Sequence, residues 1–275
     1  MVKTLLNKIP FSLTLFKFNI RTNIFFWGIL TLVMSFYICE IVFIFDPSAM
    51  QALESILEMY PQEFMSAFGM SDLGGNLAQL LAGFFYGMLV YVVPMIYYIN
   101  VANRLIAKMV DNGSLVYLLQ TPLSRLKIVI TQAIFLLLSL FLMFVLVFLV
   151  ALGMSNSMFP GQLDVVALAR LHFSTYFLSA LMASICFFYS CYFNETRLSL
   201  AFGASIPVVF LLMQMLGGIS ENLKIFLDLS IFAVIDPRAV VDNGNPLALN
   251  LAFIALTILF ISLGSWVFKR KKLPI

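Results

Sequence analysis

Six long runs of apolar residues decide what this chain can fold into. A helix needs about 20 apolar residues to cross the hydrocarbon core of a bilayer, and lipid tolerates only helices and closed barrels. The sequence therefore predicts an all-α integral membrane protein with six transmembrane helices. The runs cover residues 20–45, 77–101, 128–154, 165–193, 198–216 and 247–268.

Composition excludes an ordinary water-soluble domain. The 275 residues are 62% hydrophobic and 11% charged, whereas soluble domains are about 45–50% apolar and about 25% charged. The mean hydropathy is +1.03. So much apolar surface needs lipid as well as a protein core to cover it.

The basic residues predict the orientation of the chain. Thirteen of the sixteen Lys and Arg residues fall at the two termini or in the second-to-third and fourth-to-fifth loops, and the other three are Arg170, Lys224 and Arg238. Most acidic residues fall on the opposite side. Loops rich in Lys and Arg stay in the cytoplasm, so we expect cytoplasmic N- and C-termini and a multi-pass protein of the bacterial plasma membrane.

The segments outside the six runs predict structures at the membrane surface. Residues 1–19 mix apolar residues with spaced lysines, which is typical of an interfacial helix. Residues 46–76 predict an outer amphipathic segment. Within residues 217–246, the apolar run from Ile225 to Ile235 has only 11 residues and contains Asp228, so it is too short to cross and too apolar to be solvated. We therefore expect residues 217–246 to form a re-entrant or interfacial outer segment. Residues 269–275 form a basic cytoplasmic tail.

Several kinds of chemistry are missing from the sequence. No Gly is followed by Lys, so the chain lacks the phosphate-binding loop of an ATPase, and His172 is the only histidine, which excludes the two-histidine zinc motif. We expect no catalytic residue, no metal site, no cofactor bound by this chain and no nucleic-acid partner.

Three residues within the spans suggest specific roles. Glu40 is a carboxylate in an apolar run, where insertion costs about 2.5–3.5 kcal/mol at the bilayer centre. It either reaches the outer headgroups or a partner, or lines a translocation path. Gly83 and Gly87 form a small-xxx-small pattern that lets another helix approach closely.

The polar interruption between the second and third runs, residues 102–127, carries the strongest functional signal. Apolar residues recur at helical spacing from Leu105 to Val110, Asp111-Asn112-Gly113 can end that helix, and Thr121-Pro122 breaks a second apolar stretch. A surface segment with exposed apolar side chains is typical of a docking site for another protein.

This interruption resembles the signature of the type 2 (G-type, type V) permeases of ATP-binding-cassette (ABC) exporters. The motif I-A-x-x-x-x-x-G-S/T-L, followed by L-L-x-x-P-x-S-R, is carried by Ile106, Ala107, Gly113, Ser114, Leu115, Leu118, Leu119, Pro122, Ser124 and Arg125. In that family the segment forms the coupling helix between the second and third spans. Many members have acidic residues before the Gly, where this chain has Lys108 and Asp111.

The resemblance implies a permease subunit that works with two copies of a separate soluble ABC ATPase and with a second permease copy, as a homodimer or heterodimer. ATP and Mg would be bound by the ATPase. The substrate would be hydrophobic or amphipathic, such as a peptide, drug or lipid, exported outward. The residues expected to dock the ATPase are Arg104, Lys108, Asp111, Asn112, Gly113, Leu115, Tyr117, Leu118 and Arg125.

Two other readings stay open at this point. An ion-coupled secondary transporter would need ionisable groups at mid-membrane, for which Glu40 is the main candidate. A membrane immunity or scaffold protein would need neither an ATPase nor a translocation path.

Overall fold

The computed structural model describes residues 11–45, 55, 59–67, 76–242 and 244–272, and this part of the chain is helical, with no strand. Six helical stretches are long and apolar enough to cross a membrane, which confirms the predicted number of spans. They are Leu13–Ile44, Leu77–Asp111, Arg125–Met158, Val165–Tyr192, Thr196–Ile219 and Leu247–Arg270. The chain is therefore a multi-pass helical membrane protein.

The first span is the helix α2 (Leu13–Ile44), and it begins earlier than its apolar run. Ser12 caps it by accepting a hydrogen bond from the backbone N–H of Leu15. Its 32 residues make a helix about 48 Å long, so the first turns extend past a hydrocarbon core of about 30 Å. The described part of the expected interfacial helix, up to residue 19, is thus continuous with the span. Residues 1–10 lie outside the described residues.

The second span contains an irregularity that the sequence pattern did not predict. It consists of α5 (Leu77–Phe84), a π-helical turn η1 (Phe85–Leu89) and α6 (Val90–Leu105), and the short helix α7 (Ala107–Asp111) continues it. Gly83 is buried in α5 and Gly87 in η1, and the carbonyl of Gly87 accepts a hydrogen bond from Gln214 Nε2 at 3.2 Å. A side chain of the fifth span thereby binds a carbonyl of this turn.

The third to sixth spans are single helices, and all but the fourth extend past their apolar runs at one or both ends. Ser124 caps α9 and Asp164 caps α10 through backbone N–H groups of the first turn. These spans are α9 (Arg125–Met158), α10 (Val165–Tyr192), α11 (Thr196–Ile219) and α14 (Leu247–Arg270).

The core lies around α10, which is buried along most of its length and packs against α14, α6, α11 and α9. His172 of α10 is part of this core. Its Nε2–H donates to the carbonyl of Phe144 at 2.7 Å, so its Nδ1 accepts a hydrogen bond from the hydroxyl of Tyr86. α11 and α14 bury much less of their surface and form the periphery.

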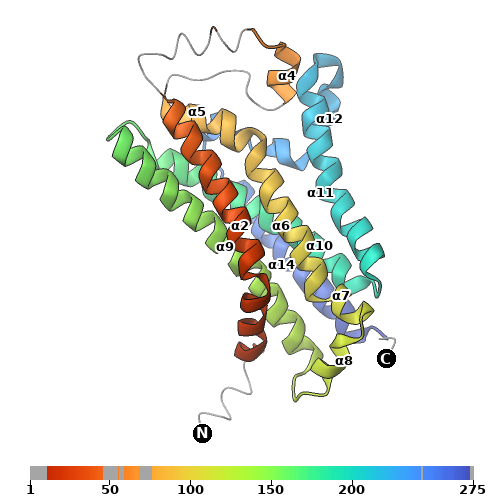
Figure 1. Ribbon diagram of the computed structural model, residues 1–275. Helices are drawn as coiled ribbons and strands as arrows, with labels where there is room; N and C mark the ends of the chain where they lie inside the picture. Colours follow the sequence, from red (N-terminus) through yellow and green to blue (C-terminus); the bar gives the residue numbers. More distant parts are fainter. Residues whose placement is uncertain (1–10, 46–54, 56–58, 68–75, 243, 273–275) are drawn as a thin grey trace.

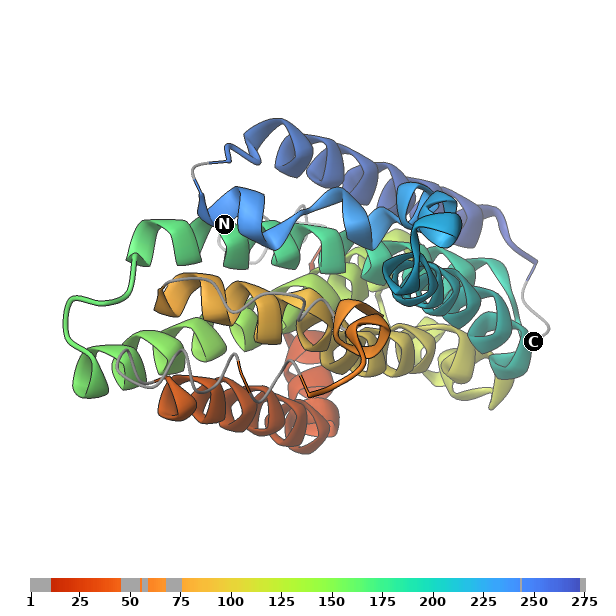
Figure 2. The same cartoon turned by 90° about the horizontal axis from the view of Figure 1, so that it is seen from above.

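One end of the bundle carries the short helices that connect the fifth and sixth spans (Figure 1). α4 (Gln62–Ala67) packs on α11 at this end, and Figure 2 shows α12 and α13 running across it. Residues 46–54, 56–58 and 68–75 of the expected outer amphipathic segment lie outside the described residues. The connecting helices are η2 (Glu221–Leu223), α12 (Lys224–Leu229), η3 (Ile231–Val234) and α13 (Pro237–Val241).

The opposite end carries α7 (Ala107–Asp111) and α8 (Ser114–Leu119), beside the start of α2 and the end of α14 (Figure 1). The described N- and C-terminal parts of the chain therefore lie at the same end of the bundle as the polar interruption between the second and third spans.

Candidate functional site

The α7–α8 segment, residues 107–119, is shaped by a tight turn between its two short helices. Gly113 has φ of 73°, a left-handed conformation that favours glycine. Asn112 Oδ1 accepts hydrogen bonds from the backbone N–H and the hydroxyl of Ser114, at 3.0 and 2.7 Å. The Asn-Gly-Ser sequence thus ends α7 and starts α8 within a few residues.

The second helix of this segment presents one aromatic side chain outward. Leu115 is 2% exposed and anchors α8 to the core, whereas Tyr117 is 75% exposed. Leu118 and Leu119 are half-buried between these extremes. A large exposed aromatic side chain is a feature of binding surfaces, because it offers contact area at little cost in side-chain entropy.

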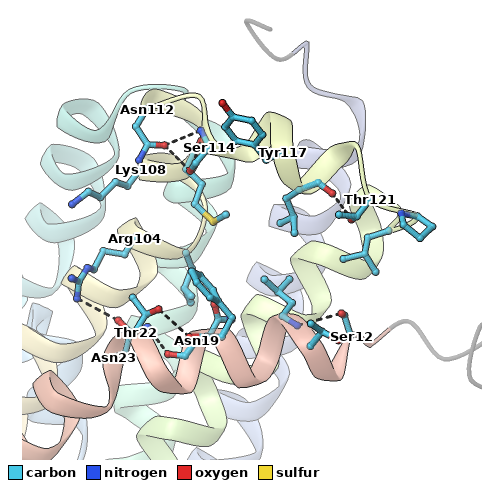
Figure 3. Close-up of a pocket in the computed structure, with 18 residues that line it drawn as sticks. Ser12, Asn19, Thr22, Asn23, Arg104, Lys108, Asn112, Ser114, Tyr117 and Thr121 are labelled. Atoms are coloured by element: carbon cyan, nitrogen blue, oxygen red, sulfur yellow. Dashed lines mark hydrogen bonds between the residues drawn. The ribbon is translucent and has the colours of Figure 1, made fainter.

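A groove of about 800 Å³ lies between α8 and the first turns of α2 (Figure 3). Most of its exposed lining is apolar, and none of the described residues that line it is acidic. Its apolar walls are Leu15, Phe18, Leu105, Met109, Leu118 and Leu123.

Two cations border this groove. Arg104 and Lys108 point to the same side in Figure 3, and both are exposed. Arg104 Nη1 donates to Asn23 Oδ1 at 3.3 Å, and within the described residues neither cation forms an ion pair. The groove therefore combines apolar walls with two positive charges that have no ion-pair partner among the described residues.

The walls of the groove are held by polar contacts inside the bundle. The backbone N–H of Ser12 donates to Thr131 Oγ1 at 2.9 Å, and Asn19 Nδ2 donates to Gln132 Oε1. Gln132 in turn donates to Met109 Sδ at 3.8 Å. α9 thus fixes both α2 and α7, the two sides of the groove.

The α7–α8 segment is also tied to the fourth and fifth spans. The backbone N–H of Ala107 donates to Ser190 Oγ of α10 at 3.0 Å, and Asp111 Oδ2 accepts from the backbone N–H of Thr196, the first residue of α11, at 3.3 Å. A displacement of α7 would therefore act directly on α10 and α11.

The structure brings together only part of the expected docking set. Arg104, Lys108, Asn112, Tyr117 and Leu118 line the groove. Leu115 is the buried residue of α8 and does not line the groove, and Gly113 forms the turn between α7 and α8.

The remaining two expected residues bind elsewhere in the chain. Asp111 faces α11, and Arg125 Nη1 donates to the carbonyl of Lys271 at 2.8 Å. No local sequence signal could have found the second contact, because its partners are 146 positions apart.

Glu40 lies far from this groove, near the other end of α2. It is exposed and borders a small hollow of about 380 Å³ with Phe36, Cys39, Phe43 and Met154 among its other lining residues. Among the residues that the structure describes, no group of three or more His, Cys, Asp or Glu side chains is placed to hold a metal ion.

The fold and the groove define the class of this protein as a six-span helical membrane protein with a built surface site at one end of its bundle. Comparison with known protein families, with curated proteins and with solved structures gives no match. The function is therefore argued from the site itself.

Proposed function

We propose that this chain is the permease subunit of an ATP-driven ABC exporter of the type 2 class, and that the groove with Tyr117 is the docking site of its ATPase. The observation that carries the proposal is the exposed Tyr117 of α8 beside an apolar groove, on a segment hydrogen-bonded to α10 and α11. A site that receives mechanical work from a soluble partner needs both an accessible surface and firm connections to the spans.

The charge of the groove specifies the docking element. Arg104 and Lys108 favour a partner segment with carboxylates at one end, and the apolar walls favour an amphipathic helix. The ATPase would supply the ATP and Mg sites, since this chain has no phosphate-binding loop. In this proposal two ATPase copies act on two permease copies, and both termini and α8 face the cytoplasm of a bacterial plasma membrane.

The proposed cycle uses the contacts of the α7–α8 segment. Closure of the ATPases on ATP pushes α8, and the hydrogen bonds of Ala107 and Asp111 pass the displacement to α10 and α11. Differential binding of ATP to the closed state supplies the bias. A hydrophobic or amphipathic substrate is the cargo class that we propose for such apolar spans. Glu40 is the residue on which the ion-coupled alternative would rest.

Photo-crosslinking tests the docking site. A benzophenone amino acid in place of Tyr117 should crosslink an ATPase that has a phosphate-binding loop, identified by mass spectrometry of the product. Tyr60 is the matched control, because it is also exposed and lies in the segment before α4, at the other end of the bundle. A crosslink from Tyr60 and none from Tyr117 would contradict both the docking site and the orientation.

Charge reversal tests the electrostatic part. Arg104→Glu with Lys108→Glu should abolish co-purification of the ATPase and leave insertion unchanged. Lys17→Glu with Arg21→Glu is the control, since these exposed cations belong to α2 and do not line the groove. Equal loss in both variants would show that only overall charge matters. Leu115 is unsuitable for such a test, because a charge at a 2% exposed core position would destabilise the fold.

A further inference from the structure

The end of α14 carries a cationic patch that the proposed docking site does not use. Lys269, Arg270 and Lys272 are all exposed. Within the described residues none of the three forms an ion pair with a carboxylate. Three neighbouring unneutralised cations repel one another, so an anion bound among them is favoured.

An exposed tryptophan lies one turn before these cations. Trp266 is 54% exposed, and the guanidinium of Arg270 lies 4.6 Å from the centroid of its ring. Stacking of this kind orients the guanidinium while its remaining N–H groups stay available. Tryptophan is enriched where the hydrocarbon of a bilayer meets the headgroups, so this pair marks the level of the lipid phosphates.

The length of α14 agrees with that placement. Its 24 residues span about 36 Å, slightly more than a hydrocarbon core of about 30 Å. Few of its residues are buried in the bundle, so most of its surface is open to lipid. Its last turn therefore lies in the headgroup region.

The patch is held in place by the residue between its cations. Lys271 Nζ donates to the carbonyl of Cys191 at 3.0 Å, and the carbonyl of Lys271 accepts from Arg125 at 2.8 Å. Phe268, on the same side of the helix end, is fully buried. Because Lys271 is fixed to α9 and α10, Arg270 and Lys272 are attached to a backbone that does not have to be ordered on binding.

We infer that the end of α14 is a binding site for the phosphate of an anionic phospholipid. Lys269, Arg270 and Lys272 supply the charge and Trp266 lies against the acyl chain. Basic residues directly after a transmembrane helix attract anionic lipids with about 1 kcal/mol each, which is roughly a fivefold gain in affinity per residue. The site does not depend on the proposed transport function.

Trp266 is a built-in reporter for the test. The chain has two tryptophans, and Trp27→Phe leaves Trp266 as the only one. This variant is placed in phosphatidylcholine nanodiscs that contain brominated phosphatidylglycerol. Brominated phosphatidylglycerol should quench Trp266 fluorescence more strongly than brominated phosphatidylcholine at the same mole fraction.

Neutralisation of the patch gives the decisive comparison. Lys269→Gln, Arg270→Gln and Lys272→Gln together should lower the preference for phosphatidylglycerol roughly 100-fold, with quenching normalised to phosphatidylcholine for each variant. The control removes three exposed cations elsewhere, through Lys17→Gln, Arg21→Gln and Arg197→Gln, and should keep the preference. Equal quenching by both lipids, or equal loss in both triple variants, would overturn the inference.

Discussion

Replacement of Gly217 by alanine tests the packing of α12 against the end of α11. A Cβ atom at this position would lie 2.4 Å from the backbone N of Leu227 and 2.8 Å from its Cα. Ordinary contact begins at 3.4 Å, so α12 would have to move by about 1 Å. The obstacle is backbone and cannot rotate away, and overpacking of this kind costs about 1–3 kcal/mol.

The measurement is the apparent melting temperature in detergent, followed by intrinsic fluorescence. Gly153→Ala in α9 is the matched control, because no atom lies within 4 Å of its added Cβ. Alanine is a better helix former than glycine by about 1 kcal/mol, so the control should melt at the same temperature or higher. Gly217→Ala gains the same helix propensity but is overpacked, so it should melt at least about 2 °C below this control. If the two variants melt alike, the close approach of α11 and α12 is wrong.

Three further predictions concern the end of the bundle that carries α8. Gln132→Leu should lower the free energy of unfolding by about 1–3 kcal/mol, because it leaves the buried Asn19 amide without its acceptor. In chemical denaturation, the double variant with Asn19→Leu should recover part of that loss. No recovery would argue against the contact between the two amides. Burial lowers the pKa of Lys271 from 10.5 to about 8, so between these pH values only the unfolded chain binds the proton. The free energy of unfolding of the wild type, relative to Lys271→Met, should therefore rise with pH from about 8 to 10.5 and stay level below pH 8. A difference in melting temperature that is flat or falls across this window would contradict it. Gly113→Ala should destabilise by about 1 kcal/mol in the same melting assay through its positive φ alone, since the space around it is open.

The spans could be predicted because they depend on local composition. Each apolar run must be covered by lipid or protein, and the helices form where the runs are. The predicted starts of the second, fourth and sixth spans agree with the helices. The first and third helices begin earlier than their runs, because caps such as Ser12 and Ser124 let helices continue past the hydrocarbon core. The π-helical turn at Phe85–Leu89 has no periodic signal of its own, and one of its carbonyls is bound by a distant side chain, Gln214.

The candidate site was predictable in location and only partly in detail. The interruption after the second span contains one wall of the groove, and its exposed aromatic, Tyr117, belongs to the expected set. The other wall comes from residues 12–23 of α2, about 90 positions earlier, which no local pattern connects to it. Arg125 looks like a docking residue in the sequence, yet its guanidinium binds the carbonyl of Lys271.

The hydrogen bond between Asp111 and Thr196 joins the α7–α8 segment to the first residue of α11. One end of this helix is held by α7, and its other end packs against α4 and α12 at the far side of the bundle. Between these ends α11 packs on α10 and α6, so a shift of α11 would also be felt by these two helices. Pro207 lies within this helix and lacks an N–H group, so one backbone hydrogen bond of α11 is missing there. α11 thus connects the surface at Asp111 with the helices at the opposite end of the bundle.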